Sequence, residues 1–334
     1  MTTPHKEKVT VIGDGGFGTA LALVLNRNGH DVSVWGFDSR VVSDIAEKGE
    51  NHIYLPGVQI PQSIRWTADR EAATQNTNTY ILAIPSKYFS DVCGSFNGLI
   101  TPENNIVSVA KGLRDGKRMS VIAAEQLQHP AATVLSGPSH AEEVALGTPT
   151  AVVAACTELE RAKSVQKLFN GPGFRVYTSD DPIGVEVGAA MKNVIAIAAG
   201  ISDGMGYGDN AKASLVTRGL AEMIRLGTAL GGQSSTFSGL SGIGDLMVTC
   251  GSRHSRNRGF GERLGKGQSK DEIIDSMQQV AEGVWNAETI HQIGEEKGLE
   301  LPITAQVYQI LYHGKDPRMA VNDLLARNPK PEQA

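Results

Sequence analysis

The chain has 334 residues, which is more than a single hydrophobic core usually serves, so we expect two domains. Its formal net charge of −5 predicts no broad basic face, and this argues against sequence-independent binding to nucleic acid. The three cysteines form no CxxC pair, and residues 1–8 hold no apolar signal core, so we expect a cytoplasmic protein with reduced thiols.

Short strand-like runs alternate with helical runs up to about residue 180. We expect strands at 9–12, 31–35, 79–83, 105–109, 132–135 and 150–154, with helices at 17–28, 40–48, 117–128 and 158–169. This alternation predicts a doubly wound α/β domain of the Rossmann type, with a mostly parallel sheet covered on both faces.

After about residue 178 the strand signal fades and helical runs follow one another. We expect helices at 183–201, 211–230, 269–280, 284–297, 303–313 and 318–327. The predicted organisation is therefore a dinucleotide-binding domain at 1–180, an all-helical substrate domain at 181–327 and a polar tail at 328–334.

A glycine-rich turn, Gly13-Asp14-Gly15-Gly16-Phe17-Gly18, separates the first strand from the first helix. Gly13 allows a tight turn, Gly15 lets the backbone approach a pyrophosphate, and Gly18 lets the helix pack on the sheet. Because a strand precedes the turn and a helix follows it, dinucleotide binding is favoured over a merely glycine-rich turn.

The end of the second strand, Trp35-Gly36-Phe37-Asp38, is expected beside the adenosine ribose of a dinucleotide. Asp38 can accept from a ribose 2′-hydroxyl and repels a 2′-phosphate, and no arginine stands at Phe37. Both features mildly favour NAD over NADP. The alternative role of Asp38 is to cap a helix that starts near Ser39.

Two further loops follow predicted strands, at the edge where open α/β sheets bind ligands. The first places Lys111 directly after the strand at 105–109, either as a ligand contact or as a solvated loop lysine. The second, Leu135-Ser-Gly-Pro-Ser139-His140, places Ser139 as a candidate N-cap with Glu142 in the capping-box position. Capping can coexist there with backbone amides turned toward a ligand.

The most apolar segment, residues 185–200, has Lys192 and Asn193 in its middle. Because they interrupt it, no apolar run reaches the roughly 18 residues of a membrane span, and we expect none. A lysine inside a dry helix bundle needs an anion, a partner or a chemical task to offset its lost hydration. Small residues on its helix face, Gly188, Ala189 and Ala196, predict a groove for a ligand. The alternative is a lysine that snorkels or pairs with one carboxylate.

The helical half also carries an acidic and a basic motif. In Gly239-Leu-Ser-Gly-Ile-Gly-Asp245-Leu246, Asp245 can pair with Lys192, or instead cap a helix from Leu246. The motif Ser252-Arg-His-Ser-Arg256-Asn-Arg258 suits a phosphate, although helical spacing prevents all its arginines from facing one ligand. A solvated basic helix start is the alternative.

These motifs, in order, resemble those of the NAD(P)-dependent sn-glycerol-3-phosphate dehydrogenases over about residues 8–325. The resemblance rests on Gly13-x-Gly-x-x-Gly18-Thr-Ala, Lys111-Gly, Leu135-Ser-Gly-Pro-Ser139, Gly188-Ala-Ala-Met-Lys192-Asn-Val-Ile-Ala196, Gly208-Asp-Asn-Ala-Lys-Ala213, Thr217-Arg-Gly-Leu220, Gly239-Leu-Ser-Gly-Ile-Gly-Asp245-Leu and Ser255-Arg-Asn257. It implies hydride transfer between NAD(P)H and dihydroxyacetone phosphate, a phosphorylated triose, and a role in supplying glycerol phosphate for phospholipids. It leaves a homodimer open.

The resemblance also implies residue roles. Lys192 is expected to transfer a proton, with Asp245 and Lys111 as its catalytic neighbours. The positions expected around glycerol phosphate are Lys111, Gly137, Ser139, Lys192, Asp245, Ser255, Arg256 and Asn257. The positions expected at the cofactor, beside Gly13, Gly15, Gly18 and Asp38, are Gly16, Phe17, Phe37, Lys111, Ala141, Arg256, Val280 and Glu282.

Some positions depart from the family pattern. Gly16 stands where the family often has a small polar residue, and Phe37 where an arginine or histidine often follows Trp-Gly. Both changes bear on cofactor preference. His140 replaces the phenylalanine common after Gly-Pro-Ser, and its role is open.

Two other functions compete with this interpretation. A sugar-nucleotide dehydrogenase would need a nucleophilic cysteine, for which Cys250 is the candidate, and it leaves the lysine motif unexplained. A non-catalytic dinucleotide sensor would not need Lys192, Asp245 and Arg256 together. The sequence shows no HExxH motif or Cys/His cluster, and a redox cofactor removes the need for a metal, so no metal is expected.

Overall fold

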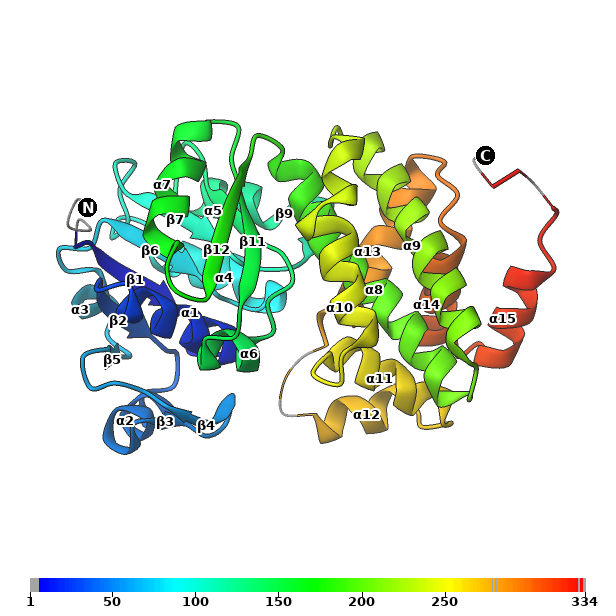
Figure 1. The fold of residues 1–334 in the computed structure, drawn as a ribbon, viewed down its shortest axis with the longest axis horizontal. Helices are drawn as coiled ribbons and strands as arrows, with labels where there is room; N and C mark the ends of the chain where they lie inside the picture. Colours follow the sequence, from blue (N-terminus) through cyan, green and yellow to red (C-terminus); the bar gives the residue numbers. More distant parts are fainter. Residues whose placement is uncertain (1–5, 278, 280, 330, 333–334) are drawn as a thin grey trace.

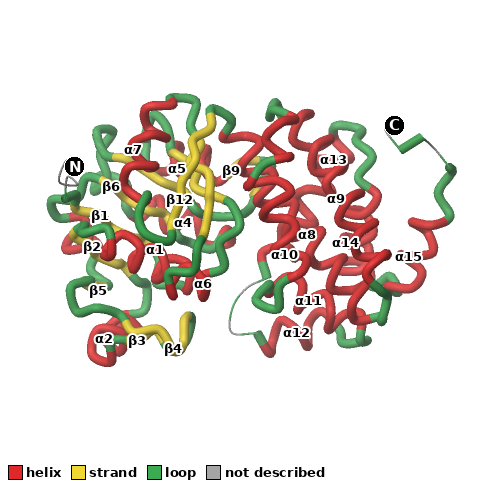
Figure 2. The backbone as a smooth tube through the Cα atoms, in the orientation of Figure 1, coloured by secondary structure: helices red, strands yellow, loops and turns green. Residues whose placement is uncertain are grey.

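A sheet-containing part precedes a helical part in the computed structural model, which describes residues 6–277, 279, 281–329 and 331–332 (Figure 1). In Figure 2 the strands gather in the first part, and helices build the second. The predicted fold class, a doubly wound α/β domain followed by an all-helical domain, is confirmed.

The main sheet has the strand order β12-β11-β10-β7-β6-β1-β2-β5. Neighbouring strands are parallel except for β10 and β11, which are antiparallel. Their bounds are β1 (Lys8–Ile12), β2 (Asp31–Trp35), β5 (Arg65–Thr67), β6 (Thr79–Leu82), β7 (Asn105–Ser108), β10 (Thr133–Ser136), β11 (Thr150–Ala155) and β12 (Phe174–Ser179). The order reverses between β1 and β6, so the loops after these strands flank the place where open α/β sheets bind ligands.

Helices cover both faces of this sheet because side chains alternate along each strand. Val9 and Val11 of β1 belong to the core shared with α1 (Gly16–Arg27) and α7 (Leu159–Phe169). Ile12 belongs to the core of the opposite face, with α4 (Phe89–Ser95) and α5 (Met119–Gln126). The remaining helices are α2 (Ser39–Lys48), α3 (Arg70–Thr74), α6 (Ala141–Leu146) and the 3-10 turn η1 (Ser86–Tyr88).

Two small hairpins extend from the sheet domain. One consists of β3 (Glu50–Asn51) and β4 (Leu55–Gln59), and the other of β8 (Leu113–Arg114) and β9 (Lys117–Arg118). Neither the hairpins nor the edge strands β5 and β12 were expected from the sequence.

The helical domain is built around α8 (Pro182–Gly204), which packs against α9, α10, α11 and α13. Glycines allow the close approach of α11, since a Cβ at Gly200 would lie 2.0 Å from the Arg258 carbonyl oxygen. The other elements are α9 (Asp209–Ala229), η2 (Ser234–Ser238), the π-turn η3 (Leu240–Gly244), α10 (Asp245–Gly251), α11 (Arg256–Gly265), α12 (Lys270–Ser276), α13 (Glu282–Glu296), α14 (Pro302–His313) and α15 (Pro317–Leu325).

The expected open groove beside Lys192 is filled at one of its small residues. A Cβ at Gly188 would lie 2.5 Å from the backbone carbonyl oxygen of Ser241, so the η3 segment occupies that space. The prediction of an open groove at Gly188 is therefore wrong. The missing side chain serves close packing of η3 on α8.

Helix α8 is long and apolar enough to cross a membrane by length and composition, with a mean hydropathy of 1.4 in its most apolar window. The sequence prediction concerned an uninterrupted apolar run, and Lys192 and Asn193 do interrupt this helix. Of that window, 89% is buried inside the protein, which is the situation of a core helix.

Candidate active site

The glycine-rich turn after β1 has the geometry that dinucleotide binding requires. Gly13 has a φ of +119°, and a Cβ there would lie 2.4 Å from the Ala83 carbonyl oxygen. A Cβ at Gly18 would lie 2.2 Å from the Gly13 carbonyl oxygen, so this glycine lets α1 pack onto the turn. Gly15 has no atom within 4 Å of its Cβ position, which leaves space for a ligand beside the backbone.

Gly16 is explained by packing. A Cβ at this position would lie 2.5 Å from the Tyr54 carbonyl oxygen in the β3–β4 hairpin and 3.7 Å from the Ala141 Cβ. Any larger residue at 16 would push this hairpin away. The Lys111 ammonium lies 5.7 Å from the ring centre of Phe17, the residue after Gly16, so the glycine-rich turn is close to Lys111.

Asp38 lies after β2 and caps α2, as the alternative reading allowed. Its carboxylate accepts from the Arg40 backbone amide at 2.9 Å and from the Arg40 guanidinium at 2.9 Å. These contacts lower the pKa of Asp38, so it is ionised at neutral pH. Phe37 is 84% exposed beside it.

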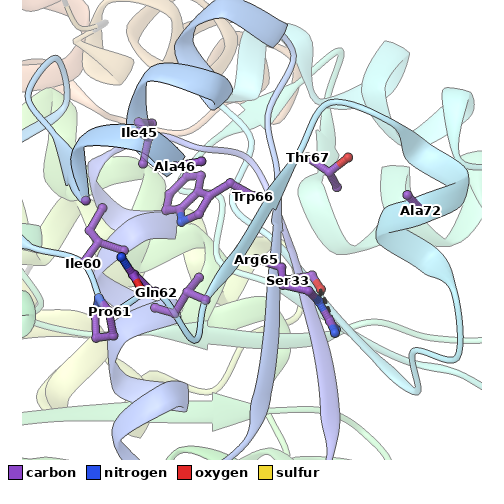
Figure 3. Close-up of a pocket in the computed structure, with 12 residues that line it drawn as sticks. Ser33, Ile45, Ala46, Ile60, Pro61, Gln62, Arg65, Trp66, Thr67 and Ala72 are labelled. Atoms are coloured by element: carbon purple, nitrogen blue, oxygen red, sulfur yellow. Dashed lines mark hydrogen bonds between the residues drawn. The ribbon is translucent and has the colours of Figure 1, made fainter.

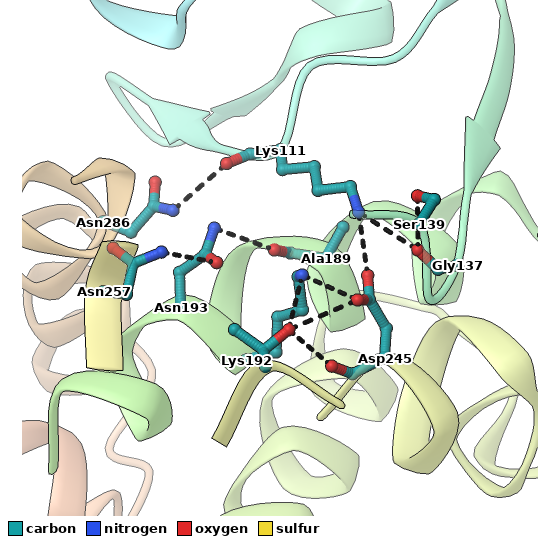
Figure 4. A network of polar contacts seen from close by, with 10 residues as sticks. Lys111, Gly137, Ser139, Ala189, Lys192, Asn193, Asp245, Asn257 and Asn286 are labelled. Carbon is teal, nitrogen blue, oxygen red and sulfur yellow. Dashed lines mark hydrogen bonds and ion pairs between the residues drawn. The ribbon is translucent and has the colours of Figure 1, made fainter. Parts of the chain in front are cut away.

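Lys192 and Asp245 form a buried ion pair, with Nζ and Oδ1 2.7 Å apart (Figure 4). Lys192 also donates to the Thr249 hydroxyl at 2.8 Å, which in turn donates to the Asp245 backbone carbonyl at 2.6 Å. Asp245 begins α10 and does not cap it, because Gly244 is the N-cap. Thr249 was missed by the sequence analysis, although it lies one turn after Asp245 on the same helix face.

Lys111 reaches this pair from the sheet domain. Its ammonium donates to Asp245 Oδ2 at 3.0 Å and to the Gly137 carbonyl at 3.1 Å (Figure 4). Lys111 comes from the loop after β7 and Gly137 from the loop after β10, whereas Asp245 belongs to the helical domain. The residues predicted from separate motifs therefore meet at the contact between the two domains.

The electrostatics of this group suit proton transfer. Burial lowers the pKa of Lys192 to about 8, and Lys111 acts in the same direction while Asp245 opposes them. Burial alone would raise the pKa of Asp245, but Lys111 and Lys192 outweigh it and hold that pKa below its usual value. A lysine whose pKa is near 8 can both donate and accept a proton at physiological pH.

An amide network continues from Lys192 along the same seam. Asn257 donates to the Asn193 side-chain oxygen at 2.9 Å and accepts from the Gly283 amide at 2.8 Å. Asn286 donates to the Lys111 carbonyl at 3.3 Å and accepts from the Leu113 amide at 3.2 Å. Helices α11 and α13 are thereby fixed relative to α8 and to the lysine loop.

The expected capping box at Ser139 is wrong. Ser139 donates to the Gly137 carbonyl at 2.9 Å, and His140 takes the N-cap position of α6 without a side-chain cap bond. The Gly137 carbonyl also accepts from Lys111, so Ser139 lies next to the network of Lys111, Lys192 and Asp245.

The basic motif lies at the start of α11, where Ser255 is the N-cap and accepts from the Arg258 amide at 3.2 Å. Its arginines diverge, as the helical spacing predicted. Arg258 pairs with Asp203 at 2.6 Å, whereas Arg256 is exposed and is attracted by Glu282. Val280, expected at the cofactor, lies outside the described residues.

His140 lies among the charged groups of the site. Its ring centre is 5.9 Å from that of His254, and its Nε2 is buried without a hydrogen-bond partner among the described residues. Burial, followed by Lys192 and Lys111, lowers the pKa of His140 and keeps it neutral. No contact in the structure explains why this position is polar.

Cys250 cannot serve as a nucleophile at neutral pH. It is 1% exposed, and burial raises the pKa of its thiol to about 12. The sugar-nucleotide dehydrogenase alternative loses its required thiolate. Within the described residues no group of three or more His, Cys, Asp or Glu side chains could hold a metal ion.

A separate hollow of about 490 Å³ lies at the opposite edge of the sheet, near β5 and α2. Figure 3 shows Trp66 and Ile45 on one side of the strand, with Arg65 and Ser33 on the other. None of the predicted site residues lines it, so it is separate from the network of Lys111, Lys192 and Asp245.

Comparison with known proteins gives one consistent family. Residues 8–162 match the N-terminal model of NAD-dependent glycerol-3-phosphate dehydrogenase, and residues 181–322 match the C-terminal model. The glycerol-3-phosphate dehydrogenase (NAD(P)+) of Geobacillus kaustophilus is 49% identical over 331 residues, covering 98% of this chain and 96% of that protein. That of Fusobacterium nucleatum is 45% identical, covering 97% of this chain and 98% of that protein.

A solved structure agrees with these relatives. The crystal structure of glycerol-3-phosphate dehydrogenase from Coxiella burnetii superposes with a TM-score of 0.93 at 40% identity, covering 96% of this chain and 99% of that one. The non-catalytic sensor alternative is therefore set aside. The chain belongs to the NAD(P)-dependent glycerol-3-phosphate dehydrogenases, oxidoreductases that interconvert dihydroxyacetone phosphate and sn-glycerol 3-phosphate.

Proposed function

We propose that Lys192 transfers the proton in this dehydrogenase, and that Asp245 and Lys111 set its charge and orientation. The observation that carries the proposal is the buried network of these three side chains at the contact between the domains. A nicotinamide cofactor supplies or accepts the hydride when it is bound. In reduction, protonated Lys192 donates from Nζ to the ketone oxygen, and in oxidation neutral Lys192 accepts the hydroxyl proton.

Lys111 and Asp245 act on Lys192 in opposite directions. The positive charge of Lys111 lowers the Lys192 pKa, whereas Asp245 raises it and holds the ammonium in place. With both lysines protonated the group carries one more cation than anion, which attracts a phosphorylated substrate. Asp245 has lone pairs beyond those used by the lysines, and these can orient a substrate hydroxyl.

The phosphate of the substrate is assigned to the start of α11. Arg256 offers a paired donor, while Arg258 is engaged by Asp203 and is not available. Ser255 and Asn257 flank Arg256 in sequence. In the sheet domain the Gly137 carbonyl accepts from both Lys111 and Ser139, and we assign Gly137 and Ser139 to the substrate as well. Phosphate binding would supply the energy that positions the ketone at Lys192.

The turn after β1 fits a dinucleotide, because Gly15 leaves open space beside the start of α1. Gly13, Gly16, Phe17, Gly18, Ala141, Val280 and Glu282 complete the positions assigned to the cofactor. We assign a modest preference for NAD, supported by ionised Asp38 and by the apolar Phe37. Arg40 limits the preference, since a guanidinium so close to Asp38 can also contact a 2′-phosphate.

The remaining assignments concern the whole protein. We divide the chain into domains at 1–180 and 181–327 with a tail at 328–334, since β12 ends at Ser179 and α8 begins at Pro182. The buried free thiols of Cys93, Cys156 and Cys250 support a cytoplasmic location. We assign the protein a role in supplying glycerol phosphate for phospholipids. We also propose that it forms a homodimer, which a mass measurement by light scattering would test.

The phosphate assignment is tested by comparing dihydroxyacetone phosphate with unphosphorylated dihydroxyacetone. The parent enzyme should strongly prefer the phosphate ester. Arg256→Ala should lower kcat/KM for the ester by roughly a hundredfold, the loss expected for a charge-assisted contact, and leave the weak activity on dihydroxyacetone unchanged. Equal losses on both substrates would refute a phosphate-specific role. Arg253→Ala, an exposed arginine of the same motif, is the matched control.

A further inference from the structure

A contact between the two domains joins Ser86 to Glu282. Ser86 opens the η1 turn after β6, on the side of the sheet where the strand order reverses. Its backbone amide donates to Glu282 Oε1 at 2.9 Å, and its hydroxyl donates to Glu282 Oε2. A serine of the sheet domain thus binds both oxygens of a carboxylate on α13.

The carboxylate of Glu282 needs these donors. Burial raises the pKa of Glu282, while the bonds from Ser86 and the charge of Arg256 oppose that shift. A carboxylate oxygen accepts more than one hydrogen bond, so the two bonds leave each oxygen able to accept another. Glu282 is therefore held in one plane and still has free acceptor positions.

Ser86 is itself fixed in place. It is 3% exposed, and a Cβ at Gly112 would lie 2.8 Å from the Ser86 Cβ. Leu113, which follows Gly112, is bound by Asn286 of α13, whose side-chain oxygen accepts from the Leu113 amide at 3.2 Å. The serine, the loop carrying Lys111 and the first turns of α13 therefore form one packed unit.

We propose that Ser86 is a positioning residue for the cofactor, which it serves by holding the Glu282 carboxylate ready to accept from hydroxyl or amide groups of the dinucleotide. This rests on the proposed cofactor contact of Glu282. The competing explanation is a tie between the domains with no effect on the ligand. A tie would change stability and leave the affinity for the cofactor unaltered.

A double-mutant cycle separates the two explanations. The variants are Ser86→Ala, Glu282→Gln and their combination, with Ser95→Ala as a matched control whose part-buried hydroxyl donates only to the Val92 carbonyl. The measurements are the dissociation constant of NADH by fluorescence titration, the KM for dihydroxyacetone phosphate, and the thermal midpoint. The thermal midpoint shows whether each variant is folded. If Ser86→Ala does not fold, Ser86→Thr, which keeps the hydroxyl, is compared with Ser86→Val, which lacks it.

If Ser86 acts through Glu282, Ser86→Ala weakens NADH binding by roughly fivefold, about the value of one hydrogen bond, with the substrate KM within twofold of the parent. The double variant then binds NADH no more weakly than Glu282→Gln alone. Unchanged NADH affinity in Ser86→Ala, or a full additional loss in the Glu282→Gln background, overturns the proposal.

The outcomes also separate this proposal from the cofactor role of Glu282. Weaker NADH binding in Glu282→Gln with parent affinity in Ser86→Ala refutes the role of Ser86 alone. Parent affinity in Glu282→Gln refutes the assignment of Glu282 to the cofactor, and the role of Ser86 falls with it.

Discussion

At the scale of single residues, the site depends on a lysine that is costly to bury. Lys192 is 5% exposed, and its ammonium loses hydration that only its partners replace. Asp245 supplies the opposite charge and Thr249 a hydroxyl acceptor. Lys111 approaches the far oxygen of the same carboxylate, so one aspartate serves two ammonium groups. Burial, with the charge of Lys111 acting in the same direction and Asp245 opposing both, lowers the pKa of Lys192 to about 8, where it can exchange protons.

The first prediction concerns pH. Because the pKa of Lys192 is about 8, kcat/KM for glycerol 3-phosphate oxidation should rise with pH through that value, as the lysine becomes a neutral base. Reduction of dihydroxyacetone phosphate should fall over the same range, since it needs the ammonium. Lys111→Met removes a positive charge near Lys192, so it should raise the Lys192 pKa and move the rise in the pH profile to higher pH. A rise that stays in place, or moves to lower pH, would show that Lys111 does not lower the Lys192 pKa.

The second prediction concerns cofactor choice. Asp38→Asn keeps the helix cap, since asparagine also caps well, but removes the negative charge and frees Arg40. The ratio of kcat/KM for NADH to that for NADPH should fall by about tenfold, or 1.4 kcal/mol. Asp44→Asn, on the same helix and paired with Lys48, should leave the ratio unchanged. An unaltered ratio in Asp38→Asn would mean that another residue sets the preference.

Part of the site could be predicted residue by residue. Lys192 and Asp245 were identified because each is a charged residue in an apolar or glycine-rich setting, and Lys111 because it directly follows a predicted strand. The structure brings the three together. Ser86 and Thr249 carry no such signal, since a serine after a strand or a threonine in a helix is ordinary. Their importance comes from tertiary contacts that only the folded chain shows.

At the scale of elements, two glycines in the turn between β1 and α1 are expected to have different roles, Gly13 in stability and Gly15 in cofactor binding. Gly13→Ala places a Cβ 2.4 Å from the Ala83 carbonyl oxygen at a positive φ, and should cost at least about 2 kcal/mol of unfolding free energy. Gly15→Ala meets no atom within 4 Å and should cost no more than about 1 kcal/mol. In urea unfolding and NADH titration, Gly15→Ala should therefore stay folded but bind the cofactor weakly. Normal NADH affinity in Gly15→Ala would show that the open space is not used.

The start of α14 gives a second prediction at this scale. Glu222 of α9 accepts from the Ile303 amide at 2.6 Å and the Thr304 amide at 3.1 Å, which the helix leaves without internal partners. Glu222→Ala should lower the free energy of unfolding by on the order of 3 kcal/mol, because two buried amides lose their acceptor. Exposed Glu296→Ala serves as the control in the same urea experiment. Equal stability of the two variants would be evidence against this cap.

Long and strongly patterned elements were predictable, and short ones were not. The expected strands are present with ends within one residue, because buried β-branched runs between turns have few other structures available. Helix α10 was expected only through the alternative role of Asp245, as the cap of a helix beginning at Leu246, and β12 was missed. In β12, Phe174 and Val176 are buried while Arg175 and Tyr177 are exposed, a weak alternation at a sheet edge.

At the scale of the whole molecule, a buried ion pair ties the domains together. Glu186 of α8 accepts from the Arg118 guanidinium at 2.8 Å and from the Ser120 amide at 2.8 Å, both at the start of α5. Glu186→Ala leaves these donors unpaired and should cost about 3 kcal/mol or more in urea unfolding. Glu160→Ala, from the exposed pair with Lys163, should cost less than about 1 kcal/mol. A small effect in both would show that the domains do not depend on this contact.

The function of the whole molecule depends on the proposed proton transfer by Lys192, at the contact between the domains, during nicotinamide-dependent reduction. The most direct measurement follows nicotinamide absorbance after dihydroxyacetone phosphate is added to the protein with NADH or NADPH. Parent enzyme and Lys192→Ala are compared, with exposed Lys48→Ala as the control. We expect rapid, phosphate-dependent oxidation that falls by at least about a hundredfold in Lys192→Ala, with NADH binding retained. Turnover in Lys192→Ala close to that of the parent would contradict it.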